Sequence, residues 1–318
     1  MKTTHLPKIL LVGTGNMARE YAKVLKALKK NFLTVGRGEE NALIFEKVTG
    51  RKAVTGGLEK WLKVIKNKIP PIAIIATNEE QLGSTARLIA QRGARLILIE
   101  KPGGMNLGDI VKTQKTAMKT GAKVFIAYNR RFYASVQKTQ KLIREDGKVL
   151  SFNFEFTEWS HKITRNKKPM AVKKIWLLAN SSHVIDLAFF LGGKPETIKC
   201  FTSGGLDWHP NASMYTGAGV SQTGALFSYH ANWESAGRWG VEILTPKRKL
   251  ILRPLEKLSV QNRDSLIVED VFLNDKLDID FKPGLYLQVK SFLNSKADLP
   301  TIQEQIENVK YYNLIEGK

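Results

Sequence analysis

Residues 8–18 read Lys-Ile-Leu-Leu-Val-Gly-Thr-Gly-Asn-Met-Ala, an apolar run that leads into a glycine-containing turn. The run predicts a buried strand, and apolar residues at helical spacing in 16–29 predict a helix directly after it. Gly13 permits a tight turn, Gly15 lets the backbone approach a pyrophosphate at the helix N-terminus, and Ala18 lets helix and strand pack closely. A glycine-rich turn without a ligand is the alternative. The G-x-G-x-x-A pattern in this position favours a dinucleotide site, and the residues that we expect to bind it are Gly13, Thr14, Gly15, Asn16 and Met17.

Apolar runs and helical stretches continue to alternate as far as Ala127. The expected strands are 8–12, 32–35, 52–55, 72–76, 95–99 and 123–127, and the expected helices are 16–29, 39–48, 58–65, 79–91 and 106–120. Strands that are apolar throughout and separated by helices indicate a parallel sheet covered on both faces. We therefore predict an α/β chain whose residues 1–127 form a doubly wound Rossmann domain.

The pattern changes after Tyr128. Residues 149–159 alternate between phenylalanine and polar side chains, which predicts a half-exposed strand. Helices are expected at 132–144, 174–191, 283–294 and 303–315, and β-type runs at 198–202, 219–233, 238–244 and 249–253. We predict that residues 128–318 form an α+β substrate domain with an open, mostly antiparallel sheet. The C-terminal helix is expected to reach back to the first domain, and the open sheet face is expected to be buried in a homo-oligomer.

The end of the second strand bears on the choice of dinucleotide. A Rossmann domain that binds NAD usually has an acid there, which accepts a hydrogen bond from the ribose 2′-hydroxyl. Here the chain reads Thr34-Val35-Gly36-Arg37-Gly38, so an arginine follows the strand. We predict that Arg37 binds the 2′-phosphate of NADP. In the alternative, Arg37 is a solvated loop residue and Glu39 or Glu40 binds the ribose of NAD.

The sequence Glu100-Lys101-Pro102 follows the fifth expected strand. Ligands of doubly wound sheets bind outside the carboxyl ends of the strands, so Lys101 is placed to face a nicotinamide ring. A partly buried lysine beside a positive nicotinamide is expected to have a lowered pKa, which suits proton transfer. A surface ion pair between Lys101 and Glu100 is the alternative.

The helix expected at 174–191 carries Asn180, His183 and Asp186. His183 and Asp186 are three residues apart and share a helix face, so an imidazole and a carboxylate are available for proton relay and substrate orientation. We expect Asn180 and Asp186 to contact substrate, and a satisfied core histidine is the alternative for His183. The remaining histidines, which show no metal-ligand spacing, are His5, His161, His209 and His230.

Composition excludes several classes of protein. The 318 residues include 50 Lys and Arg against 29 Asp and Glu, a formal net charge of +21. The lysines are scattered and no nucleic-acid-binding motif accompanies them, so we expect a basic surface and no nucleic-acid partner. No apolar run is long enough to span a bilayer, and no signal peptide is expected. A single cysteine, Cys200, fits a reducing cytoplasm, and no metal site is expected.

Together these motifs resemble the family of glucose–fructose oxidoreductase, inositol dehydrogenase and the rhizopine-catabolism protein, called Gfo/Idh/MocA. The residues that carry the resemblance are Gly13 to Ala18, Ala76-Thr77-Asn78, Glu100-Lys101-Pro102, Asn129-Arg130-Arg131-Phe132 and His183-Val184-Ile185-Asp186-Leu187. The resemblance covers nearly the whole chain. It implies NAD(P)-dependent oxidation or reduction of a hydroxyl or carbonyl carbon, usually on a sugar, inositol or nucleotide-linked sugar, by a dimer or tetramer.

The resemblance also implies roles for single residues. Lys101 corresponds to the active-site lysine of the family, and His183 to its helix histidine, often assigned to proton transfer. Thr77 and Asn78 correspond to a turn that lines the cofactor, and Glu100 is expected near the nicotinamide ribose. The residues expected near the domain junction, where they would contact substrate, are Tyr128, Asn129 and Arg131.

Two positions depart from the family pattern. Ala179 stands four residues before the histidine, where many members have an aspartate, and Leu82 stands where many have a histidine. A sensor or assembly protein of the same fold is therefore the alternative to an enzyme. The basic segment 162–174 is either a clamp for a phosphate, which favours a phosphorylated or nucleotide-linked sugar, or a solvated loop.

Overall fold

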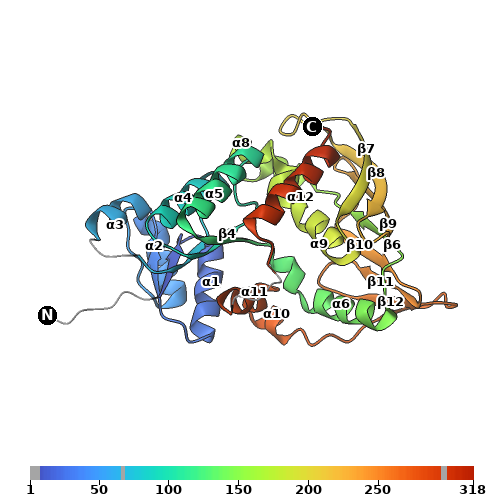
Figure 1. Ribbon diagram of the computed structural model, residues 1–318, viewed down its shortest axis with the longest axis horizontal. Coiled ribbons are helices and arrows are strands. Elements are labelled where there is room, and N and C mark those ends of the chain that lie inside the picture. Colours follow the sequence, from blue (N-terminus) through green and yellow to red (C-terminus); the bar gives the residue numbers. More distant parts are fainter. Residues whose placement is uncertain (1–7, 66–68, 295–298) are drawn as a thin grey trace. The chain divides into compact units, whose positions relative to one another are not determined.

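The computed structural model describes residues 8–65, 69–294 and 299–318 (Figure 1). His5 lies outside these residues. The chain divides into two compact units, which are described separately. Unit 1 comprises Met1–Tyr128 and Leu285–Glu307, and unit 2 comprises Asn129–Gly284 and Asn308–Lys318.

Unit 1 is built on a five-stranded parallel sheet in the order β2-β1-β3-β4-β5. Its strands are β1 (Ile9–Val12), β2 (Phe32–Val35), β3 (Ile72–Ile75), β4 (Leu96–Glu100) and β5 (Lys123–Ala127). Most of their side chains are buried, as expected for a sheet covered on both faces. The chain passes from β1 to β2 on one side and to β3 on the other, which creates the switch point where doubly wound sheets bind ligands.

The helices of unit 1 form two groups. In Figure 1 α4 and α5 lie side by side, while α1 packs on α2 and on α11. The helices are α1 (Asn16–Ala27), α2 (Glu39–Thr49), α3 (Leu58–Val64), α4 (Leu82–Gln91), α5 (Leu107–Thr120) and α11 (Leu285–Leu293). The expected strand at 52–55 is reduced to one parallel bridge between Val54 and Val35, because only Val54 exchanges hydrogen bonds with β2.

Unit 2 contains an eight-stranded sheet in the order β13-β12-β11-β10-β6-β9-β8-β7. Only β6 and β9 pair in parallel, so the sheet is mostly antiparallel, as the sequence predicts. Its strands are β6 (Ser151–Glu155), β7 (Pro195–Ser203), β8 (Met214–Ser221), β9 (Leu226–Asn232), β10 (Gly240–Leu244), β11 (Arg248–Leu252), β12 (Ser259–Asn262) and β13 (Val268–Asp270). The single run expected at 219–233 was wrong, because a turn at Gly224 divides it between β8 and β9.

One face of this sheet packs on α9 (Ser182–Gly192). Phe152 and Phe154 of β6 are buried edge-to-face against Phe189 of α9, with ring centroids 6.5 Å and 5.5 Å apart. A π-helical turn, Leu177–Ser181, precedes α9. The other helices of this part of the chain are α6 (Ala134–Asp146), α7 (Ser160–Arg165), α8 (Met170–Lys173) and α10 (Lys276–Asp280), with α12 (Ile302–Ile315) last in the chain. The basic segment 162–174 is therefore partly helical.

Candidate active site

The glycine turn after β1 has the geometry that its sequence predicts. Gly13 has φ +121°, and a Cβ there would lie 2.3 Å from the carbonyl oxygen of Ala76. A Cβ on Gly15, by contrast, would meet nothing within 4 Å. Gly15 also precedes α1, whose N-terminus has no side-chain cap among the described residues. Open space beside uncapped backbone N–H groups fits a pyrophosphate.

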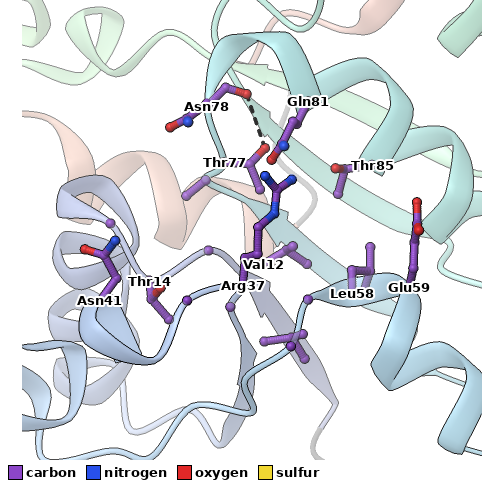
Figure 2. A pocket seen from close by; sticks show the side chains of 18 of the residues that line it. Val12, Thr14, Arg37, Asn41, Leu58, Glu59, Thr77, Asn78, Gln81 and Thr85 are labelled. Atoms are coloured by element: carbon purple, nitrogen blue, oxygen red, sulfur yellow. Dashed lines mark hydrogen bonds between the residues drawn. The ribbon is translucent and has the colours of Figure 1, made fainter. Parts of the chain in front are cut away.

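A cavity of about 810 Å³ opens at this turn, at the carboxyl ends of β1, β2 and β3 (Figure 2). Its size suits a small-molecule or cofactor site. Gly36 lines the cavity. A Cβ on Gly36 would lie 2.4 Å from Cγ2 of Thr14, so glycine allows the end of β2 to lie this close to the turn. Among the predicted cofactor residues, the cavity lining includes Gly13, Thr14, Gly15, Arg37, Thr77 and Asn78.

Arg37 points into the cavity in Figure 2. Glu39 and Glu40, the alternative ribose ligands, lie exposed in the first turn of α2 and are not among the residues that line the cavity. Glu59 of α3 is the acid among the residues that line the cavity, which makes it a candidate to bind a ribose hydroxyl. The sequence prediction did not include Glu59, because α3 follows a loop that reaches the cavity only through the fold.

The carboxyl end of β4 carries the second predicted cluster of unit 1. The Tyr21 hydroxyl donates a 2.6 Å hydrogen bond to Oε1 of Glu100, and its buried position raises the Tyr21 pKa well above the usual value. Lys101 follows directly, half-buried, before a cis peptide bond to Pro102. Tyr21 of helix α1 therefore orients the Glu100 carboxylate. Lys101 lies directly after the end of β4, as predicted.

His183 lies in the first turn of helix α9 of unit 2 and is 6% exposed. Its imidazole faces the indole of Trp239, with ring centroids 6.2 Å apart. Asp186, three residues on, accepts two hydrogen bonds from Arg131, at 2.8 Å from Nε and 2.6 Å from Nη2. This buried bidentate pair satisfies both charges within unit 2.

Two other predicted substrate residues are also engaged inside their own units. The Tyr128 hydroxyl accepts a 3.1 Å hydrogen bond from Gln305 Nε2, and Asn129 Nδ2 donates to the carbonyl of Pro283 at 2.9 Å. Both side chains are buried. Asn180, in the π-helical turn before His183, is partly exposed, unlike these two buried residues.

Sequence reasoning missed a carboxylate beside this turn. Glu158 accepts hydrogen bonds at 2.8 Å from Asn180 Nδ2 and Ser181 Oγ, and at 3.1 Å from Arg238 Nη1. Glu158 is 2% exposed, and its burial raises its pKa even though these three donors oppose the shift. The signal was present: Phe152, Phe154 and Phe156 point inward at a period of two, and 158 is the next inward position. A carboxylate therefore lies against the turn that contains Ala179.

Comparison with known proteins agrees with this geometry. Residues 7–128 match the family model GFO_IDH_MocA, described as an oxidoreductase family with an NAD-binding Rossmann fold. The match covers the Rossmann part of the chain. The resemblance inferred from the motifs is thereby confirmed. None of the curated proteins matches the chain in sequence.

Solved structures resemble the chain from end to end at low identity. Levoglucosan dehydrogenase in complex with NADH and levoglucosan is 18% identical, covers 96% of this chain and 95% of its own, and has a TM-score of 0.76. UDP-N-acetylglucosamine 3-dehydrogenase GnnA from Acidithiobacillus ferrooxidans is 15% identical over 97% and 96%, with a TM-score of 0.74. An oxidoreductase from Desulfitobacterium hafniense described as a putative NADPH-dependent enzyme is 15% identical over 97% and 94%, with a TM-score of 0.79. At such identities the likeness establishes the fold.

The match to a family model with an NAD-binding Rossmann fold is consistent with a dinucleotide in the cavity at the glycine turn. A bound nicotinamide dinucleotide supplies a hydride acceptor or donor. In the described parts of the chain no helix is both long and apolar enough to cross a bilayer.

Proposed function

We propose that the protein is an NADP(H)-dependent oxidoreductase that transfers a hydride to or from a hydroxyl- or carbonyl-bearing carbon of a sugar, which is phosphorylated or nucleotide-linked. The observation that carries the cofactor choice is Arg37. It points into the cavity at the end of β2, where an NAD-binding domain usually presents an acid. The sugar is favoured by two structural neighbours whose names are those of sugar dehydrogenases.

The residues of unit 1 bind the dinucleotide in this proposal. The N-terminus of α1 and the open space at Gly15 accept the pyrophosphate, and Arg37 pairs with the 2′-phosphate. Thr77 and Asn78 line the cavity beyond β3, and Glu100, oriented by Tyr21, accepts from the nicotinamide ribose. Asn16 and Met17 contribute backbone N–H groups of the first helical turn.

Lys101 and His183 handle the proton that accompanies the hydride. We assign proton transfer at the reacting oxygen to the Nζ atom of Lys101, and substrate orientation or relay to the imidazole of His183. Asn180 presents its side-chain oxygen to a substrate hydroxyl. Tyr128, Asn129, Arg131 and Asp186 support the substrate residues through their buried hydrogen bonds.

A titration with NADPH and NADH tests the cofactor assignment. We expect tighter binding of NADPH, and we expect Arg37→Gln to lose that preference while it binds NADH as before. Arg51→Gln is the matched control, because Arg51 is an exposed arginine outside the cavity that stacks on Phe32 at 5.6 Å. A wild-type preference for NADH would contradict the Arg37 assignment, and binding of neither would contradict the oxidoreductase.

A cofactor-binding sensor or assembly protein is the second candidate, and Ala179 is the observation that favours it. A screen of NADPH oxidation with oxidised sugars and sugar phosphates separates the two, because a sensor binds NADPH without turnover. We also propose a homo-oligomer that covers the half-exposed outer face of the unit 2 sheet, which light scattering of the pure protein would test. We place the protein in the cytoplasm, which localisation of a tagged chain would test.

A further inference from the structure

Cations and indole rings alternate along one row of unit 2, which we call the cation–indole ladder: Arg130, Trp239, Arg238, Trp159 and Lys162. The guanidinium carbons of Arg130 and Arg238 lie 4.7 Å and 4.6 Å from the ring centroid of Trp239. The Arg238 guanidinium carbon lies 4.8 Å from Trp159, and Lys162 Nζ lies 4.0 Å from the same ring. Three cations are thus held against two indole rings.

The ladder runs from a buried end to an exposed end. Trp239 is 5% exposed and faces the imidazole of His183, with ring centroids 6.2 Å apart. Trp159 at the other end is 39% exposed, and Lys162 is exposed. A ligand that lies along the ladder therefore has one end beside His183 and the other near solvent.

The positive charge of the ladder is not balanced within it. Glu158 pairs with Arg238 at 3.1 Å and is also bonded to Asn180 and Ser181. Arg130 forms no ion pair with any described residue, and its Nε atom is buried without a hydrogen-bond partner. Burial lowers the Arg130 pKa and outweighs the charges of Tyr133, Glu256 and Glu158, which act in the opposite direction.

A guanidinium with a buried and unpartnered Nε is costly to fold, because burial removes water from that N–H group without supplying an acceptor. Cation–π contact with one indole offsets only part of that cost. Arg131, the next residue, is by contrast fully paired with Asp186. Arg130 is therefore set up to receive an anion from outside the chain.

We propose that the cation–indole ladder is the subsite for the acidic group of the substrate, with Arg130 as its inner cation and Lys162 as its outer one. This inference rests on the proposed function, because it names the class of sugar that the site takes: one that bears a phosphoryl, diphosphoryl or carboxylate group. Binding of that group places the sugar ring beside Trp239 and His183. The anion receives charge-assisted hydrogen bonds from guanidinium groups already stacked in place.

Calorimetric titration in the absence of turnover tests the subsite directly. The probes are UDP-glucose, glucose 1-phosphate and glucuronate, with methyl glucoside as the neutral counterpart. We expect the anionic probes to bind and methyl glucoside to bind at least about tenfold more weakly. The anion that binds most tightly shows whether the subsite prefers a diphosphate, a monophosphate or a carboxylate.

Variants locate the binding energy. Arg130→Gln is expected to weaken binding of the preferred anion at least about tenfold and to leave methyl glucoside unaffected. Lys162 is exposed, so its substitution should not affect folding. Lys162→Gln is expected to weaken binding of the anion by a few-fold. Arg51→Gln, an arginine stacked on Phe32 in unit 1, is the control and is expected to bind like the wild type.

The outcomes separate the two proposals. Arg130-dependent binding of an anionic sugar that is never oxidised or reduced supports the subsite and counts against the proposed function. Turnover of neutral and anionic sugars with equal kcat/KM, unchanged in Arg130→Gln and Lys162→Gln, overturns the subsite and leaves the proposed function standing.

Discussion

Asn180 donates a hydrogen bond from Nδ2 to Oε1 of Glu158 across 2.8 Å. The bond fixes the orientation of the amide, because the nitrogen is committed to the carboxylate and the oxygen is left to accept from another group. Ser181 donates to the same oxygen of Glu158. A residue of the strand-end loop thus determines what the helix before His183 can present to a substrate.

The pH dependence of stability is the first test of this arrangement. Burial raises the Glu158 pKa, so the folded state holds the proton more tightly than the unfolded chain does. The contribution of Glu158 to the free energy of unfolding must therefore fall as pH rises from the ordinary glutamate value through the raised pKa. Urea unfolding of the wild type and Glu158→Gln, from about pH 4 to about pH 8, measures the difference. A wild-type advantage that grows with pH would contradict the assigned shift.

Alanine substitutions at the two glycines of the first turn are predicted to affect different properties, stability at Gly13 and NADPH binding at Gly15. Gly13→Ala places a Cβ 2.3 Å from the Ala76 carbonyl oxygen at φ +121°, so we expect a loss of about 1–3 kcal/mol of stability. Gly15→Ala meets no atom within 4 Å and should melt like the wild type. Its methyl group occupies the space proposed for the pyrophosphate, so NADPH affinity should fall about tenfold or more. Wild-type NADPH affinity in Gly15→Ala would place the cofactor elsewhere.

The buried pair of Arg131 and Asp186 is predicted to be important for stability. Asp186→Asn leaves the guanidinium buried without its counter-charge, and we expect a loss of about 3–5 kcal/mol. Glu20→Gln is the comparison, because it removes the partner of Lys23 in an exposed pair and should cost about 0–1 kcal/mol. Denaturant unfolding at neutral pH gives both values. Equal, small losses would mean that the buried pair contributes no more than a surface one.

Catalysis is tested at the two proton-handling residues. Lys101→Ala and His183→Asn should each lower kcat by about 10²- to 10⁴-fold, the usual contribution of a positioned acid or base. NADPH affinity, followed by fluorescence titration, should stay within a few-fold of the wild type in both. Full turnover in Lys101→Ala would remove that residue from the mechanism. Loss of NADPH binding in either variant would show a structural effect and contradict the assigned role.

Local patterns predicted the parallel sheet of unit 1. The turn at Gly13 and the strand end at Lys101 are set by residues adjacent in sequence, so their positions followed from periodicity and strand context. The β-type run at 52–55 pairs at Val54 only, because pairing depends on the neighbouring strand and not on the run itself.

The site residues of unit 2 were harder to predict because they depend on partners distant in sequence. The motif around Asn129 indicated Arg131 as a substrate residue, but Arg131 donates hydrogen bonds to Asp186. The neighbouring Arg130 stacks on the ring of Trp239. Neither pairing has a local signature. Glu158 is intermediate, since strand alternation predicts its burial but not the helix turn that it contacts.

The composition of unit 1 has a consequence for biosynthesis. Ile126 of β5 donates a hydrogen bond to the carbonyl of Pro300, Phe125 bridges to Thr301, and α11 packs on α1. These partners come much later in the chain than β5, so they leave the ribosome after it. The nascent Rossmann sheet therefore keeps an open edge and an uncovered helix until residues 285–301 have been synthesised. A fragment that ends at Tyr128 would retain both defects and would be prone to edge-to-edge aggregation.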